Sequence, residues 1–198
     1  MRRRAEWLKL SIRARRRGQA MASPVGMSAS LPLVTDIRTA QLSSLAWRAG
    51  ASRSLQRRRR AATTALGSAT VMTGLSLYQL GTIRRLPDLP VRGFDANRVD
   101  ASAHAYQLLS APDATLGVLS YASTAVLAGA GGPRPPAAIT AALLAKATLD
   151  LGWAIKLTAD QPLKHRAACS WCLIASALTV ATFVAAAGEA RARLMGRS

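Results

Sequence analysis

The sequence predicts an all-α fold: an integral membrane four-helix bundle with both termini on the cytoplasmic side, preceded by a basic arm. The chain has 198 residues, is 50% hydrophobic, and carries a formal net charge of +18. The charge is concentrated in residues 1–60, which hold 15 basic and two acidic residues. The remainder contains four long apolar stretches, and a helix needs about 20 such residues to cross a bilayer. A basic arm joined to an apolar membrane domain accounts for both properties.

Residues 1–55 are expected to form a disordered basic arm, and residues 56–198 to form the four-helix domain. The arm is rich in Arg and Ser and poor in acids. That composition also suits a helix on an anionic membrane surface, a non-specific nucleic-acid-binding tail or an organellar transit peptide. Translation from Met21 or Met27 is a further alternative. The sequence leaves these readings open, and we assign the arm no function.

Four membrane spans follow the arm, and we expect them at residues 61–83, 114–132, 137–158 and 167–188. Three of the four contain no charged residue, whereas the third contains Lys146, Asp150 and Lys156. All are rich in Ala, Gly, Ser and Thr, small residues that let helices approach closely in lipid. A soluble bundle of buried, Ala-rich helices is the alternative interpretation.

The arginines predict how the spans are oriented. Arg57–Arg60 directly precede the first span, and further arginines follow the last one at positions 191, 193 and 197. Positively charged flanks stay on the cytoplasmic side of a membrane. We therefore expect both termini inside, with the loops at 84–113 and 159–166 outside.

Lys146 and Asp150 stand four residues apart in the third span and can pair on one helix face. Pairing lowers the cost of placing charges in the membrane. We favour a structural ion pair over a proton path or a polar group beside a bound ligand.

The chain has only two cysteines, Cys169 and Cys172, which form a C-x-x-C pair at the outer end of the fourth span. Three residues along a helix correspond to about 300°, so both thiols are expected on one face. There they can close a disulfide, and a helix N-terminus favours the reactive thiolate. Two buried cysteines acting as small apolar residues are the alternative. A zinc site would need four ligands, of which His165 supplies only one more.

The cysteine pair belongs to a longer pattern, Cys169-Ser170-Trp171-Cys172-Leu173, followed by small residues at 175, 176 and 177. A second pattern runs from the outer loop into the second span and consists of Ser102, Pro112, Gly117 and Tyr121. With these two patterns, residues 61–193 resemble the vitamin K epoxide reductase family in its bacterial multi-pass form.

The resemblance implies a membrane thiol–disulfide oxidoreductase that passes electrons from dithiols at the outer face to a quinone of the menaquinone or ubiquinone type, without a metal. By analogy, Cys172 faces the quinone and Cys169 exchanges with the incoming dithiol. Trp171 is expected in an aromatic belt at the outer interface, and a contact with the quinone is the weaker interpretation for it. Ser102 matches a loop position that supports this exchange. A plain loop or N-cap serine is the alternative for Ser102.

The implied partners are the lipid bilayer and a thioredoxin-like or other dithiol protein, and no specific nucleic acid is expected. The implied location is the bacterial inner membrane, with the redox cysteines on the extracytoplasmic side.

The sequence departs from the family in one respect. Many members carry a second cysteine pair in the loop after the first span, which relays electrons from a thioredoxin-like partner. The corresponding loop here, residues 84–113, has no cysteine. Either a donor attacks the Cys169–Cys172 disulfide directly, or the family's activity is altered or lost. The main alternative is therefore that the protein is a non-catalytic membrane relative with a structural disulfide or a partner-docking role. A third possible function is that the basic arm tethers nucleic acid or anionic lipid to a membrane.

Overall fold

The structure is a computed structural model that describes residues 36–106 and 110–196. The chain divides into two units, Met1–Ile37 and Arg38–Ser198, and the second contains the elements below. Our expectations for the arm over residues 1–35 lie outside the described residues.

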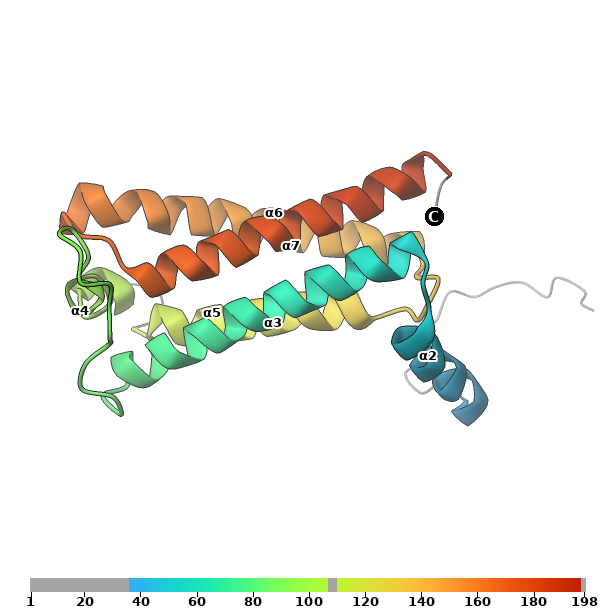
Figure 1. The fold of residues 1–198 in the computed structure, drawn as a ribbon, viewed down its shortest axis with the longest axis horizontal. Helices are drawn as coiled ribbons and strands as arrows, with labels where there is room; N and C mark the ends of the chain where they lie inside the picture. Colours follow the sequence, from blue (N-terminus) through green and yellow to red (C-terminus); the bar gives the residue numbers. More distant parts are fainter. Residues whose placement is uncertain (1–35, 107–109, 197–198) are drawn as a thin grey trace, which may run out of the picture. The chain divides into compact units, whose positions relative to one another are not determined.

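Four long helices make up most of the second unit (Figure 1). They are α3 (Arg53–Gln79), α5 (Asp113–Gly129), α6 (Ala137–Asp160) and α7 (Ser170–Leu194). Helix α3 packs against α5 and α7, and α6 packs against α7 and α5. The described residues contain helices and one isolated bridge between Phe94 and Ala168, so the all-α class is confirmed.

Each predicted span corresponds to one of these helices, with shifted ends. Helix α3 begins before residue 61 and therefore includes the arginine run, while α5 has only 17 residues. Two stretches, Ala137–His165 and Ser170–Leu194, are each long and apolar enough to cross a membrane. The crossing of a membrane by all four helices stays a prediction.

Residues assigned to the disordered arm form a helix in the structure, α2 (Ile37–Ala49). The guanidinium of Arg59 holds its end, donating to the carbonyl of Gly50 at 2.7 Å and to those of Ala46 and Trp47. The last carbonyls of a helix lack intrahelical partners, so this cap stabilises α2. The expected disorder is therefore wrong for this helix.

Arg58 caps the end of α5 in the same way. Its side chain is only 1% exposed and donates to the carbonyl of Ala128 at 3.0 Å, and to those of Ala130 and Gly132. These carbonyls end α5 and begin the turn after it. A single arginine thus fixes the end of α5 against the start of α3.

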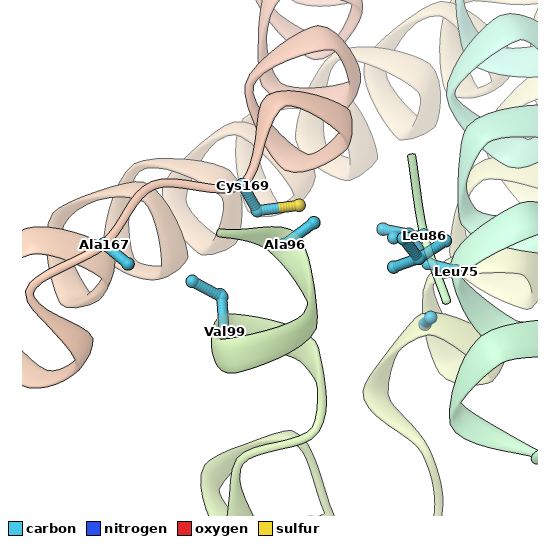
Figure 2. Close-up of a cluster of buried hydrophobic side chains, with 7 residues drawn as sticks. Leu75, Leu86, Ala96, Val99, Ala167 and Cys169 are labelled. Atoms are coloured by element: carbon cyan, nitrogen blue, oxygen red, sulfur yellow. The ribbon is translucent and has the colours of Figure 1, made fainter. Parts of the chain in front are cut away.

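The helix interfaces are lined mainly by small residues, as expected for close packing. One buried cluster lies at the arginine end and consists of Ala61, Ala128, Leu143, Ala147 and Ala186. Hydroxyl pairs join the helices along their length, such as Thr64 with Thr182 at 2.7 Å. Another cluster surrounds Cys169 at the opposite end and includes Leu75, Leu86, Ala96 and Val99 (Figure 2).

The loop between α3 and α5 folds over the cysteine end of the helices. Its short helix α4 (Ala96–Asp100) follows a parallel bridge, in which Asp95 N–H donates to the Ala168 carbonyl at 2.9 Å. The Trp171 indole N–H donates to the carbonyl of Pro87 at 2.6 Å. These bonds hold the loop on the segment that leads into α7.

Candidate functional site

Cys169 and Cys172 lie at the N-terminus of α7, as predicted, and the structure holds both as free thiols. Cys169 is the N-cap residue, and its Sγ accepts a hydrogen bond from the Cys172 N–H at 3.2 Å. We expected both residues within the helix; Cys169 instead stands just before it. The N-cap position places its sulfur among the N–H groups of the first turn that lack intrahelical partners.

The two cysteines differ in accessibility, in the opposite order to our expectation. Cys169, nearer the helix end, is 0% exposed because α4 and its loop cover it (Figure 2). Its N–H donates to Gln161 Oε1 at 2.9 Å. Cys172 is partly exposed. An incoming reactant therefore meets Cys172 first.

Asp100, the last residue of α4, is the functional residue that sequence reasoning missed. Its carboxylate lies next to Cys172, whose Sγ–H donates to Oδ1 at 3.6 Å. The side chain is 5% exposed, and burial raises its pKa to about 6. At pH 7 most of the carboxylate is ionised, so it can accept a proton from Cys172. In the sequence Asp100 is one of several loop acids, and nothing marks it out.

The sulfurs of Cys169 and Cys172 and an Asp100 carboxylate oxygen lie within 4.8 Å of one another. Two thiolates and a carboxylate can ligate a metal ion. Closed structural zinc sites use four protein ligands, and the described residues bring three together here.

An apolar cavity of about 420 Å³ lies between the long helices and opens onto Cys172 and Asp100. All four helices contribute to its walls. The larger apolar side chains are Met72, Leu75, Leu116, Leu149, Trp153 and Leu157. The volume falls in the range of small-molecule sites, which are mostly apolar with a few polar groups.

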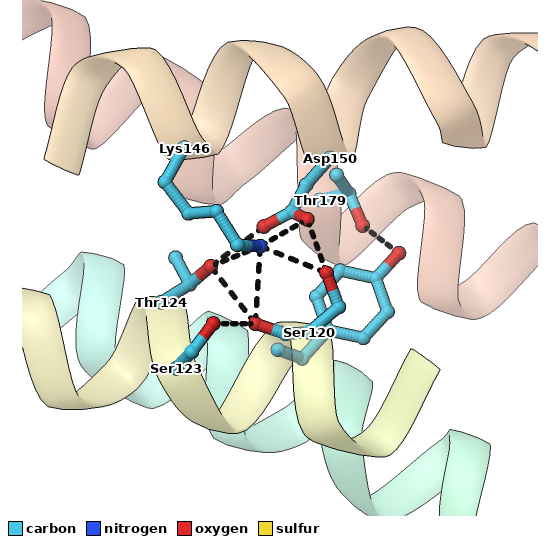
Figure 3. A network of polar contacts seen from close by, with 7 residues as sticks. Ser120, Ser123, Thr124, Lys146, Asp150 and Thr179 are labelled. Atoms are coloured by element: carbon cyan, nitrogen blue, oxygen red, sulfur yellow. Dashed lines mark hydrogen bonds and ion pairs between the residues drawn. The ribbon is translucent and has the colours of Figure 1, made fainter. Parts of the chain in front are cut away.

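The ion pair expected in the third span is confirmed and borders this cavity (Figure 3). Lys146 Nζ contacts Asp150 Oδ1 at 2.5 Å and donates to Ser120 Oγ at 2.8 Å. Ser120 and Thr124 donate to the Asp150 carboxylate at 2.7 and 2.6 Å. Since both charges have partners, the structural interpretation is the better supported one.

A second, more polar cavity of about 320 Å³ lies at the cysteine end of the helices. Cys172 and Asp100 line it as well, so the sulfur stands where the two cavities adjoin. Ser102 lines the polar cavity together with His104 and His165, whose rings lie 5.4 Å apart. The structure thus brings Ser102 to the same space as Cys172.

Trp171 does not occupy the position inferred for it. Its indole N–H donates to the Pro87 carbonyl in the loop between α3 and α5. The tryptophan that lines both cavities is Trp153, on α6. Spacing in the sequence does not distinguish which of the two tryptophans faces the cavities.

A sequence model of the vitamin K epoxide reductase family matches residues 59–187. No curated protein and no solved structure matches the chain significantly. The match runs from α3 through most of α7 and includes Ser102, Cys169 and Cys172. Because it covers more than half of the chain, the chain belongs to the vitamin K epoxide reductase family, whose members are membrane thiol–disulfide oxidoreductases.

Proposed function

We propose that the protein oxidises thiols at the outer face of a bacterial inner membrane and passes their electrons to a quinone of the menaquinone or ubiquinone type. One observation carries this proposal: Cys172, half of a redox pair, lines the apolar cavity between the four helices. We also propose four spans with both termini inside, which the arginines before the first span and after the last one support. A thioredoxin-like or other dithiol protein is the donor that the family resemblance implies.

The apolar cavity suits a quinone as substrate. Its aliphatic and aromatic walls match an isoprenoid-bearing ring, and the polar groups of Cys172 and Asp100 line it as well. Gly117 lines it where a Cβ atom would lie 3.0 Å from Met72 Sδ. The absent side chain therefore keeps space open. The quinone supplies the two-electron acceptor, and the protein supplies the thiols, the orientation and the dry surroundings.

In the reduced state, the Cys172 thiol donates to Asp100, which takes its proton as the sulfur reacts. Closing the Cys169–Cys172 disulfide releases two electrons and two protons, which convert the quinone to a quinol. A thiolate entering from outside attacks the disulfide at Cys172, and a second thiol completes the exchange. Cys169, the N-cap residue of α7, is the leaving thiolate, and its sulfur keeps the hydrogen bond from the Cys172 N–H. Ser102 lines the approach to Cys172 and is assigned to support the exchange.

The test is thiol alkylation with a gel-shift readout in isolated membranes. After mild reduction, added quinone should re-oxidise the pair, and Cys172→Ala should abolish that shift. Thiols that stay reduced, or a disulfide indifferent to quinone, would contradict the proposal.

Two glycine variants test whether the quinone binds in the apolar cavity. Gly117→Leu fills the cavity next to Met72 and should slow re-oxidation and weaken quinone binding measured by equilibrium titration. Gly152→Ala is the matched control, because a Cβ atom at that helical position meets nothing within 4 Å. Equal effects of the two variants would place the quinone elsewhere.

A non-catalytic relative with a structural disulfide is the second candidate. The observation that favours it is the absence of any cysteine besides Cys169 and Cys172 in the full sequence, which removes the family's loop relay. This candidate predicts a disulfide that quinone leaves unchanged in the gel-shift experiment.

A further inference from the structure

The donor must reach the redox pair without a protein-borne relay. The full sequence contains only Cys169 and Cys172, so no loop cysteine can pass electrons to them. Cys169 is 0% exposed beneath α4. A donor therefore meets the sulfur of Cys172. This residue lines the polar cavity.

The polar cavity has the size of a small-molecule site rather than of a protein-docking surface. Its volume of about 320 Å³ lies at the low end of the range for small ligands. Specific protein partners instead cover roughly 800 Å² of each surface. A donor that enters this cavity to reach Cys172 is a small molecule.

The cavity offers charges of both signs near its mouth. Asp160 stands between two lysines, with its Oδ2 accepting from Lys156 Nζ at 3.0 Å and from Lys164 Nζ at 2.8 Å. His104 and His165 add ring nitrogens. A ligand that carries both an ammonium and a carboxylate group finds partners for each on this wall.

Ser102 adds an independent sign of a polar ligand. Its Oγ is buried and, within the part of the chain that the structure describes, makes no hydrogen bond. A buried hydroxyl without a partner costs free energy that a bound polar group recovers. Ser102 lines the same cavity as Cys172, so such a group would lie close to the reactive sulfur.

We propose that the polar cavity binds a low-molecular-weight thiol of the amino-acid or peptide type, which reduces the disulfide at Cys172 directly. This inference rests on the proposed function, since it names the donor for the same redox pair. Ser102 and the charged groups on Lys156, Asp160 and Lys164 hold the ligand. Its sulfur faces Cys172.

The chemistry balances with two molecules of the thiol. The thiolate of the first attacks Cys172 Sγ, which breaks the Cys169–Cys172 bond, forms a mixed disulfide and releases the Cys169 thiolate. The thiolate of the second attacks the ligand sulfur of the mixed disulfide and leaves as the oxidised small disulfide. Two electrons and two protons then reside on Cys169 and Cys172, and the quinone is their acceptor.

The test uses the purified full chain with its disulfide formed and no quinone present, so that only the reductive half is measured. Reduction is followed by alkylation and gel shift as the donor concentration rises. Glutathione and cysteine carry both charged groups, 2-mercaptoethanol carries neither, and reduced thioredoxin represents a protein donor. We expect saturation with glutathione and cysteine, and a slower, linear dependence with 2-mercaptoethanol and thioredoxin.

Lys164→Gln should raise the half-saturating concentration of glutathione about tenfold, or 1.4 kcal/mol, and leave 2-mercaptoethanol unaffected. Ser102→Ala should act in the same direction. Arg92→Gln is the matched control, since it removes an exposed basic charge from the loop between α3 and α5, and Arg92 does not line the polar cavity. Saturation with thioredoxin alone, or equal losses with glutathione and 2-mercaptoethanol, would overturn the inference. Quinone-dependent re-oxidation is measured separately, so its failure would count against the proposed function instead.

Discussion

The surroundings of Asp100 change the acid–base properties of its carboxyl group. Burial raises its pKa to about 6, and its carboxylate lies 3.6 Å from Cys172 Sγ. A proton acceptor works best when its pKa lies near the operating pH. In the proposed reaction, the ionised Asp100 can therefore take the Cys172 proton above pH 6, and it loses that ability as it becomes protonated below pH 6.

Asp100→Asn should lower the rate of quinone-dependent thiol oxidation by about 10²–10³-fold, because the amide cannot accept the proton. The wild-type rate should fall as the pH drops through about 6. The residual rate of the variant should lack that step. Stopped-flow measurement of quinol formation from pH 5 to 8 tests this, and an unchanged pH profile in the variant would exclude Asp100 as the acceptor.

The sequence predicts the cysteine pair but not its surroundings. The C-x-x-C spacing is local, so its place at the start of the last helix follows from the pattern of the chain. Asp100 is 72 residues away from Cys172 in sequence, and it arrives only because α4 folds over α7. The burial of Cys169 has the same cause. Contacts between residues so far apart in the sequence cannot be inferred from residue spacing or composition.

At the scale of elements, the arginine run before the first apolar stretch also caps two helices. We interpreted it as an orientation signal, and in the structure Arg58 and Arg59 cap the ends of α5 and α2. An arginine run looks the same in a sequence whether its side chains meet solvent or carbonyl groups. The helices were therefore predicted, while the contacts that end two of them were not.

Arg58→Lys should lower the free energy of unfolding by about 2 kcal/mol, because a lysine keeps the charge but loses the fork that reaches several carbonyls. Arg60→Lys, an exposed position in the same run, is the control and should have little effect. Thermal denaturation in detergent measures both. Equal shifts in Tm would mean that the cap on α5 contributes nothing.

The Lys146–Asp150 pair joins α6 to Ser120 and Thr124 on α5. Lys146→Met should destabilise the protein by about 3–5 kcal/mol, since it leaves a buried carboxylate unpaired. Adding Asp150→Leu should recover most of that loss and leave quinone-dependent re-oxidation intact. A double variant that folds stably but no longer reduces quinone would assign the pair a functional role instead.

At the scale of the whole molecule, four spans with both termini inside is a prediction that site-specific labelling tests. The four apolar stretches of the sequence correspond to α3, α5, α6 and α7, and two of these helices pass a length-and-hydropathy criterion for crossing a membrane. Helix α3 carries arginines in its first turns, and α5 is short. Hydropathy cannot decide how such helices lie, because packing against neighbours shields their polar positions.

Single cysteines placed in the two connecting regions test the orientation. In a background of Cys169→Ala and Cys172→Ala, Arg92→Cys should react with an impermeant maleimide added outside intact cells. Arg134→Cys, in the turn between α5 and α6, should react only after the membrane is opened. Both positions are exposed, so their reactivity reports the side of the membrane. The opposite pattern would reverse the proposed topology.

The position of Cys172 between two cavities sets the kinetic order of the whole reaction. One sulfur cannot react with a thiol and a quinone in the same instant, so the enzyme alternates between an oxidised and a reduced form. Initial rates measured at several fixed quinone concentrations should give parallel lines in a double-reciprocal plot, the pattern of a ping-pong mechanism. A compound that enters either cavity and covers this sulfur would stop both halves of the cycle.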